Sequence, residues 1–171
     1  MGCPPTFFLI PGWSLLLDPL TLRLRDQVAR LGFELVDARI AGPPGRRSVK
    51  LRIDRPESHP GAGVTSEDCT GVTRAMLQWF AAEVPPVAVD AFEVSSPGIE
   101  RPVRWPEHWR RFLGRRVKVR APGVPGRVIG VIREVPDDDH VVVEFEGIGP
   151  RLLGLADIAE ATLVADWSRA R

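Results

Sequence analysis

Hydrophobic residues recur along the first part of the chain in the rhythm of an α-helix. After Asp18 the apolar positions are spaced by three or four residues, which places them in one stripe along a helix packed on one side. The stripe consists of Leu20, Leu24, Val28 and Leu31. Asp18 is a suitable cap, Pro19 is preorganised for the first helical position, and Gly32 is a typical stop signal.

Two alternating segments and a second helical segment follow. The runs 33–40 and 48–55 alternate apolar with polar residues around a Pro/Gly turn, and they predict an antiparallel hairpin. Thr65 and Asp68 have the spacing of a capping box, which starts a helix that runs to about Glu83 and is ended by Pro85-Pro86. The run 87–94 is a third strand. This order predicts an α+β layer, αββαβ, with both helices on one face of a small sheet.

The remainder of the chain reads as one short helix and several short strands. Residues 106–114 begin with Pro and end with Gly, and we expect Trp109, Phe112 and Leu113 to point inward. The strand-like runs are 115–120, 128–135, 141–146, 151–155 and 158–164. Four or five such strands, bent by tight turns, predict a small β-barrel of the SH3 or Sm kind.

The stretch 93–102 separates these two kinds of sequence. Pro97 and Gly98 occupy the second and third positions of a four-residue turn, which is type II chemistry because Pro fixes φ and Gly accepts a positive φ. Arg101 precedes Pro102 and is therefore kept extended. The turn is either a stiff joint with a role of its own or simply a domain boundary. Its residues are Ser95, Ser96, Pro97, Gly98, Arg101 and Pro102.

These patterns divide the chain into four parts. They are an irregular leader (1–17), an N-terminal α/β domain (18–95), an interdomain joint (96–102) and a C-terminal SH3-like barrel (103–171). At 171 residues the chain is long enough for one medium or two small domains, and 44% hydrophobic residues argue against disorder. The Met1–Thr6 match to an N-myristoylation pattern is attributed to chance, and we expect no membrane association.

The two cysteines indicate a reducing compartment. Cys3 and Cys69 make no disulfide framework, which favours the cytoplasm. Cys69 falls on the apolar face of its helix, so we interpret it as a buried structural thiol. His59, His108 and His140 lie in separate contexts, and the chain lacks hydrolase, P-loop, dinucleotide and zinc motifs. We therefore expect no enzyme, no metal and no cofactor.

Charge is unevenly distributed although the net charge is only +1. Residues 98–133 carry ten Lys/Arg against two acids, a balance of +8, whereas residues 134–171 carry three Arg against nine acids, a balance of −6. The basic part is a candidate RNA-phosphate surface. Its residues are Arg115, Arg116, Lys118, Arg120 and Arg127, extended at the joint by Arg101, Arg104, Arg110 and Arg111. A solvated strand face is the alternative interpretation.

Two further charged groups have open interpretations. A second basic group lies on the hairpin, where a solvated face and a secondary contact with protein or RNA are both compatible with the pattern; it consists of Arg46, Arg47, Lys50 and Arg52. The acidic segment 137–139 reads as a solvated hairpin tip, with a metal site or a contact to a basic ribosomal protein as alternatives.

Four motifs in order resemble the bacterial ribosome maturation factor RimP family. Phe92 to Val103 is similar to the family's signature at its domain junction, and three shorter segments support it: Gly63 to Cys69, Phe112 to Val119 and Ile158 to Val164. The resemblance covers roughly residues 15–164. It implies an α/β N-terminal domain, a C-terminal SH3-like barrel, and a non-enzymatic role in late assembly of the small ribosomal subunit, with contacts to rRNA and a ribosomal protein near the decoding region.

The chain departs from the family pattern at Trp105, where a polar helix cap is expected, and in the loops 42–45 and 57–63. These departures affect fine contacts. We expect a monomer that binds immature small subunits. The alternative function is an Sm-like RNA-binding regulator or a protein adaptor that is not dedicated to ribosome assembly.

Overall fold

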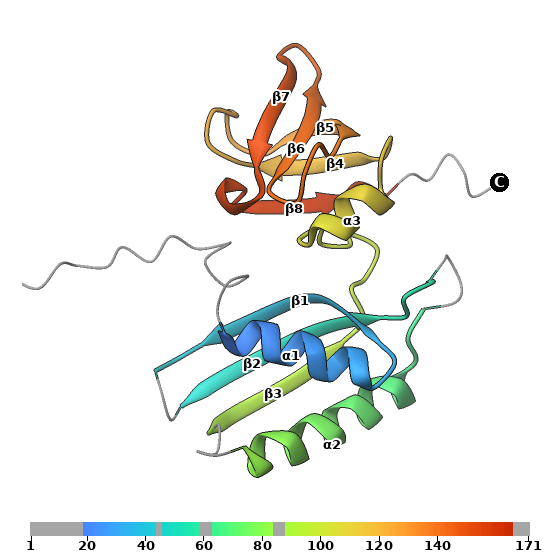
Figure 1. The fold of residues 1–171 in the computed structure, drawn as a ribbon, viewed down its shortest axis with the longest axis vertical. Helices are drawn as coiled ribbons and strands as arrows, with labels where there is room; N and C mark the ends of the chain where they lie inside the picture. The colour runs from blue at the N-terminus through green and yellow to red at the C-terminus, as the bar shows by residue number, and fades with distance from the viewer. Residues whose placement is uncertain (1–18, 44–45, 59–62, 84–87, 166–171) are drawn as a thin grey trace, which may run out of the picture.

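The computed structural model describes residues 19–43, 46–58, 63–83 and 88–165 and consists of two sheets, one above the other in Figure 1, with a short helix between them. Each sheet has its own hydrophobic core. The leader, the Asp18 cap, the Pro85-Pro86 stop and Val87 lie outside the described residues.

The first sheet has three strands and two helices in the predicted order. The elements are α1 (Pro19–Arg30), β1 (Glu34–Ala41), β2 (Arg47–Asp54), α2 (Ser66–Ala82) and β3 (Val89–Ser95). The spatial order is β1-β2-β3, with β1 antiparallel and β3 parallel to β2. The αββαβ prediction is therefore confirmed.

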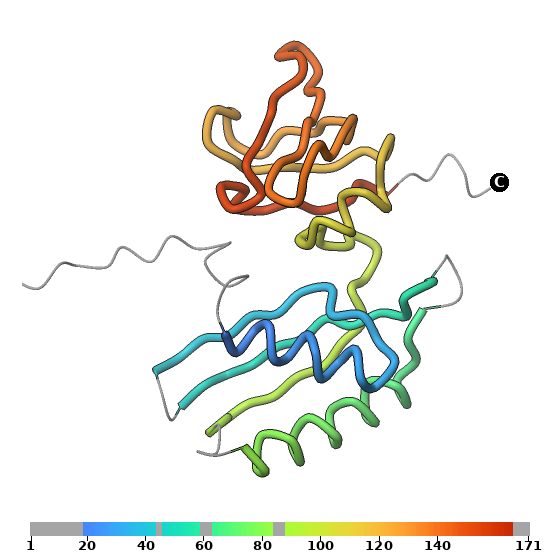
Figure 2. Tube along the Cα trace, viewed as in Figure 1, coloured from blue at the N-terminus to red at the C-terminus, as the bar shows by residue number. Residues whose placement is uncertain are grey.

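Both helices cover the same face of this sheet, as Figure 2 lets the reader follow. Leu24 and Val28 of α1 and Met76 of α2 enter one core with Val49 and Leu51 of β2. The alternation of β2 explains this arrangement, because its apolar side chains all point to one side of the sheet. The capping box is also confirmed, since Thr65 and Asp68 each accept a hydrogen bond from the other's backbone N–H.

The C-terminal end of α1 corrects the predicted apolar stripe. Gly32 has a φ of 86°, its N–H donates to the Ala29 carbonyl, and the Phe33 N–H donates to the Val28 carbonyl. This Schellman arrangement ends the helix at Arg30. Leu31 was expected in the stripe but follows the last helical turn, so it is exposed instead of packed.

The second sheet contains all five predicted strands. They are β4 (Arg116–Arg120), β5 (Val128–Glu134), β6 (His140–Phe145), β7 (Gly149–Gly154) and β8 (Glu160–Leu163), with a 3-10 turn, η1 (Leu155–Asp157), before β8. The hydrogen-bonded order is β7-β6-β5-β4-β8, and every pair is antiparallel. Among the described residues these strand pairs do not close into a barrel.

The short helix α3 (Pro106–Arg111) lies between the sheets and is shorter than predicted. Phe112 is its C-cap, and Gly114 follows with a φ of 76°. Trp109 is fully buried and Phe112 is partly buried, as expected. Leu113 was expected to point inward but is half-exposed, because it comes after the helix has ended.

The joint leads directly into the second sheet. Gly98 has a φ of 74°, which confirms the positive φ that the turn requires. Beyond the turn the chain runs along the edge of β8, where the Val103 N–H donates to the Ala161 carbonyl and the Leu163 N–H donates to the Arg101 carbonyl. The end of the joint is thus tied to the second sheet.

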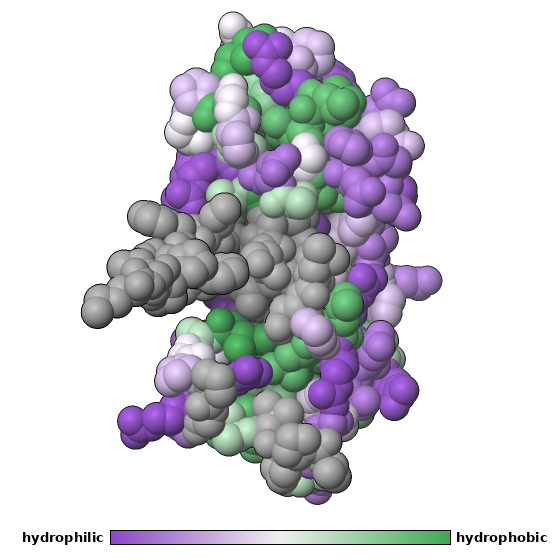
Figure 3. Space-filling model, turned by 60° about the vertical axis from the view of Figure 1, so that its left-hand side comes forward, coloured by the Kyte–Doolittle hydropathy of each residue, from purple (hydrophilic) through white to green (hydrophobic). Residues whose placement is uncertain are grey.

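The surface is mixed in character. Figure 3 shows hydrophobic areas on both parts of the molecule, beside extensive hydrophilic surface. None of the helices in the described part of the chain is long and apolar enough to cross a membrane.

Among the glycines of the second sheet, Gly130 is the one at which an added Cβ would lie closest to other atoms. We predict that Gly130→Ala destabilises the protein. A Cβ at this position would lie 2.6 Å from Val143 Cγ1 and 2.8 Å from the Glu144 carbonyl oxygen. We expect a loss of about 1–3 kcal/mol, measured by urea unfolding.

Gly71→Ala is the matched control. Gly71 lies inside α2, where a Cβ would meet nothing within 4 Å. This change should stabilise the protein by about 0.5–1 kcal/mol. Equal stabilities for the two variants would contradict the packing of β5 against β6.

Candidate nucleic-acid interface

Strand β4 presents its basic side chains to the outside. Val117 and Val119 are fully buried in the core of the second sheet, so the residues that alternate with them point away from it. We call the outward residues, with their neighbours before β4 and before β5, the β4 basic face; it consists of Arg115, Arg116, Lys118, Arg120 and Arg127.

The members of the β4 basic face differ in their partners. Glu160 of β8 lies 2.7 Å from Arg127 and 4.0 Å from Arg120. Arg115, Arg116 and Lys118 form no ion pair within residues 19–43, 46–58, 63–83 and 88–165. The uncompensated charge is therefore concentrated at the beginning and middle of β4.

Arg110 and Arg111 of α3 each meet a carboxylate. The Arg110 Nη2 lies 2.5 Å from Asp138 on the β5–β6 turn, and the Arg111 Nη1 lies 2.9 Å from Glu34 on β1. Both side chains keep some exposure, but their charges are already partly balanced. They are separate from the β4 basic face.

Arg101 was expected to extend the RNA-binding surface, and its position in the structure contradicts this. Its side chain is buried, pairs with Asp54 at the end of β2, and lies 3.2 Å from Glu34. It also donates to the Ser58 hydroxyl over 3.3 Å and lies over the Phe112 ring. Its charge is therefore used inside the junction between the sheets and is not presented to an outside phosphate.

Glu34 is the acidic centre of this junction. Besides the two arginines, the His108 Nε2 lies 2.5 Å from it, and His108 is fully buried. Burial by itself would raise the pKa of the Glu34 carboxyl, but the hydrogen bond and charge of His108 and the charges of Arg101 and Arg111 outweigh it and lower the pKa to about 2. Glu34 therefore remains ionised and holds α3 and the joint against β1.

Trp105 fixes the same junction by packing. It precedes α3 in sequence, yet its side chain belongs to the core of the first sheet. Its indole N–H donates to the Leu35 carbonyl of β1 over 2.8 Å, and the Arg25 guanidinium lies over its ring at 4.3 Å. The residue that departs from the expected polar cap thus makes no cap hydrogen bond and anchors one sheet to the other.

Arg104 was also expected on the outer surface, but its side chain is largely buried. Its Nε lies 2.6 Å from Asp37, which is itself buried on β1. A bulge between Leu35 and Asp37 shifts the register, so that Asp37 stands opposite Arg52 on the face of the sheet away from the helices. Arg104 therefore acts as a contact between the sheets.

The second basic group is spread along the beginning and outer face of β2. Arg46 lies 3.7 Å from Asp90, and Lys50 lies 2.8 Å from Glu93, so both have partners on β3. Within the part of the chain that the structure describes, Arg47 and Arg52 form no ion pair. Arg52 faces a cleft next to Asp37.

The acidic turn and the remaining candidate residues have local partners. Asp137 accepts a hydrogen bond from the Asp139 N–H over 2.8 Å and lies 2.9 Å from the His140 Nδ1; these contacts lower the pKa of its carboxyl. Across the described ranges, no group of three or more His, Cys, Asp or Glu could hold a metal ion. Cys69 is half-buried, and burial, with the nearby Asp68, raises the pKa of its thiol.

Sequence reasoning missed the carboxylates that position the basic residues. Glu34, Asp37 and Asp54 were treated as ordinary strand residues. A usable signal existed, because an acid inside or at the end of an apolar strand needs a cation when it is covered. Arg39, which lies 3.6 Å from Asp37, was not considered a site residue at all.

We predict that Glu34→Gln removes stability at neutral pH and that the loss disappears in acid. The pKa of Glu34 falls from 4.5 to about 2 on folding, so its stabilisation is fully present above about pH 4.5 and is lost as the pH falls toward 2. The expected loss at pH 7 is of the order of 1–2 kcal/mol after allowance for solvent screening. Thermal unfolding at several pH values measures it.

Glu57→Gln is the control for this prediction. Glu57 is exposed and forms no ion pair with any described residue. Its substitution should leave the pH profile of stability unchanged. A Glu34→Gln variant whose unfolding temperature runs parallel to that of the wild type from pH 7 to pH 2 would contradict the role of Glu34.

A comparison with known protein families identifies the first sheet. Residues 23–100 match the model of the RimP N-terminal domain. The match begins within α1, covers β1, β2, α2 and β3, and ends in the turn after Gly98. Two of the four sequence motifs, at 63–69 and across 92–103, lie wholly or mostly within it. This match supports the RimP family, which the sequence motifs also resemble.

Proposed function

We propose that this protein is a non-enzymatic maturation factor for the small (30S) ribosomal subunit that binds immature particles through rRNA phosphates and a ribosomal protein near the decoding region. The match to the RimP N-terminal domain supports the class of function. The uncompensated positive charge on β4 is the observation that carries the RNA-binding part of the proposal.

The β4 basic face suits a phosphate backbone better than a base. Arg116 and Lys118 project from one strand, and their neighbours across the sheet on that face include Ile129 and Thr162. Alternate strand residues are about 6.5–7 Å apart, which is comparable to the spacing of phosphates along a nucleic-acid strand. Trp105 and Trp109 are buried, so neither offers a stacking platform for bases. Binding should therefore depend strongly on salt and little on sequence.

The architecture that we propose has two domains and a stiff joint. The two cores support a division into an N-terminal α/β domain and a C-terminal domain. The five short antiparallel strands support an SH3-like small barrel, although among the described residues their hydrogen-bonded pairs leave the sheet open between β7 and β8. In this arrangement the joint 96–102 determines how the β4 basic face is presented to a large partner. The protein acts as a cytoplasmic monomer and needs no cofactor.

An Sm-like RNA regulator or a protein adaptor is the alternative function. The exposed basic strand alone is compatible with either, because phosphate contacts carry no information about which RNA is bound. The family match favours ribosome maturation. Sedimentation distinguishes them: a maturation factor travels with free small subunits and is absent from translating ribosomes, whereas a messenger-RNA regulator need not.

We predict that Arg115→Glu, Arg116→Glu and Lys118→Glu combined abolish association with immature small subunits. These side chains have no ion pair to lose within the described residues, so the fold should persist and circular dichroism and unfolding temperature should stay close to wild type. The slope of log K against log salt should become shallower by about 2–3, because up to three phosphate contacts are removed. Sucrose-gradient cosedimentation and salt titration provide the measurements.

The matched control reverses three exposed arginines outside the β4 basic face, namely Arg30, Arg74 and Arg151. None of them forms an ion pair in the described part of the chain, and the change in net charge is the same. The control should retain subunit association. If both triple variants lose association equally, the effect depends on net charge alone. If the β4 variant retains association, the β4 basic face is not the RNA contact.

A further inference from the structure

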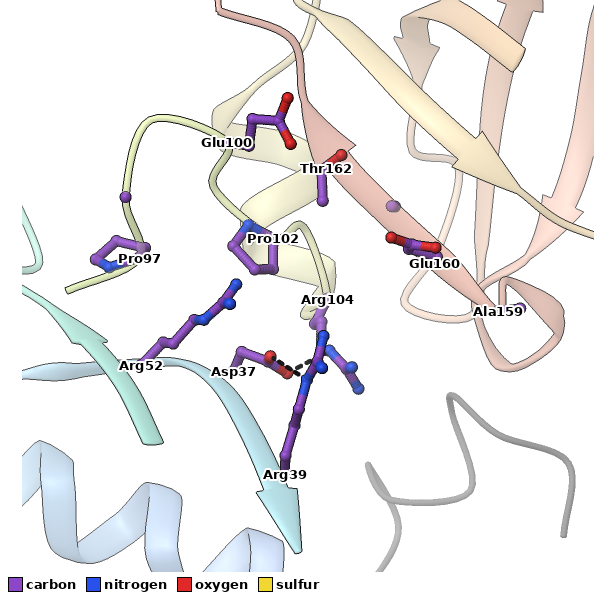
Figure 4. A pocket seen from close by; sticks show the side chains of 12 residues that line it. Asp37, Arg39, Arg52, Pro97, Glu100, Pro102, Arg104, Ala159, Glu160 and Thr162 are labelled. Carbon is purple, nitrogen blue, oxygen red and sulfur yellow. Dashed lines mark ion pairs between the residues drawn. The ribbon is translucent and has the colours of Figure 1, made fainter. Parts of the chain in front are cut away.

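A cleft of about 350 Å³ separates the outer face of the first sheet from the edge of the second. Arginines from three places in the chain line it: Arg39 on β1, Arg52 on β2 and Arg104 in the segment before α3. Figure 4 shows these side chains on one side, with Pro102, Thr162 and Glu160 across from them. The cleft is distinct from the β4 basic face, which has no residue in its lining.

One buried carboxylate, Asp37, pairs with two of the three arginines. Asp37 lies 2.6 Å from the Arg104 Nε and 3.6 Å from the Arg39 Nε, and Figure 4 shows both contacts. Arg52 stands directly opposite Asp37 in the strand register, yet it forms no ion pair with Asp37 or with any other described residue. Its guanidinium extends toward Pro102 in Figure 4. The cleft therefore contains a cation whose neighbouring carboxylate is already engaged.

The formal charges of the cleft lining are equal in number, but one of its carboxylates is shared with arginines outside the cleft. Its lining holds the three arginines against Asp37, Glu100 and Glu160. Glu160, however, is engaged from outside the cleft by Arg127 at 2.7 Å and Arg120 at 4.0 Å. Among the described residues, the lining together with these two partners of Glu160 contains five guanidinium groups and three carboxylates. Glu100 is exposed, so its charge is screened by solvent.

The environment of Arg104 is consistent with a surplus of positive charge. Burial lowers the pKa of its guanidinium, Asp37 raises it, the like charges of Arg39 and Arg52 lower it, and Glu160 raises it. An added anion between the three arginines would relieve this repulsion. It would also give Arg52 the charge-assisted partner that it lacks among the described residues.

A second hollow beside the cleft provides space for the rest of a ligand that carries a phosphate group. This hollow has a volume of about 190 Å³, adjoins the cleft along the outer face of the first sheet and shares Asp37, Arg39 and Arg52 in its lining. In that hollow Lys50 and Glu93 balance each other at 2.8 Å. Arg52, which lines both hollows, is the arginine without an ion pair among the described residues, and planar guanidinium groups can bind phosphate oxygens in pairs.

From this convergence we propose that the cleft between the sheets is a second anion site, in which Arg39, Arg52 and Arg104 bind one phosphate group. The ligand contacts β1, β2 and the segment before α3 simultaneously. Its binding therefore favours the arrangement in which the two sheets are held together. This site does not depend on RNA binding at the β4 basic face.

The test is a titration of the full chain with inorganic phosphate at constant ionic strength, with chloride as the exchanged anion. We expect the unfolding temperature to rise as the phosphate concentration exceeds its dissociation constant. Isothermal titration calorimetry measures that constant. Arg52→Gln should weaken phosphate binding at least tenfold. Arg39→Gln, an exposed position, should weaken it in the same direction and covers the case in which Arg52→Gln does not fold.

Arg47→Gln is the matched control, since Arg47 lies on the same strand, also forms no ion pair among the described residues and does not line the cleft. It should bind phosphate like the wild type. The triple β4 variant should also keep the phosphate effect, which separates a failure of this site from a failure of the proposed RNA surface.

The source of the phosphate is distinguished by a short RNA tetranucleotide. Tighter binding of the RNA than of inorganic phosphate, lost in Arg52→Gln, identifies a site for an RNA phosphodiester; equal binding identifies a site for free phosphate. Both results support the proposal. Phosphate affinity that is unchanged in Arg52→Gln and Arg39→Gln overturns it, as does Arg52-dependent binding of a polyglutamate peptide when phosphate does not bind.

Discussion

The buried ionic cluster around Arg101 is the interaction on which the arrangement of the molecule depends. A guanidinium and two carboxylates, Asp54 and Glu34, are withdrawn from water at the point where the joint passes between the two sheets. Removing such charges from water is costly unless the geometry is good and every group is paired. Any displacement of one sheet against the other would leave a buried charge without its partner. The cluster therefore specifies a particular arrangement more than it adds stability.

This specificity has a direct bearing on function. In the function proposed above, the protein binds one large particle through two surfaces. Holding them at a fixed distance strengthens binding, because the cost of ordering them is met during folding and not at binding. The ionic cluster, the Trp105 anchor and the Asp37–Arg104 contact all restrain the same junction. The exposed charges on β4 and the arginines of the cleft then stand in a defined relation to each other.

The sequence predicted the elements well and their mutual contacts poorly. Periodicity located every α-helix and strand of the described residues, because apolar spacing and turn chemistry are local properties. It did not predict the 3-10 turn η1, where Leu155 was placed in a strand. Leu31 and Leu113 were misplaced since both follow a helix that ends earlier than the apolar pattern does. The basic strand β4 was identifiable, whereas Arg101 and Arg104 were assigned to the surface. Their burial depends on Glu34, Asp37 and Asp54, which lie far away in the chain, and on a bulge in β1 that leaves no clear trace in the residue pattern.

Trp105 shows that the boundary drawn from the sequence match differs from the boundary drawn from core packing. By sequence the residue lies beyond the matched N-terminal region, which ends at residue 100. By packing it is a core residue of that region, with its indole hydrogen-bonded to β1. A fragment that ends at residue 100 would therefore lack the core residue Trp105 and would expose apolar surface of α1 and β1. The first sheet is thus not a complete folding unit at residue 100, where the family match ends.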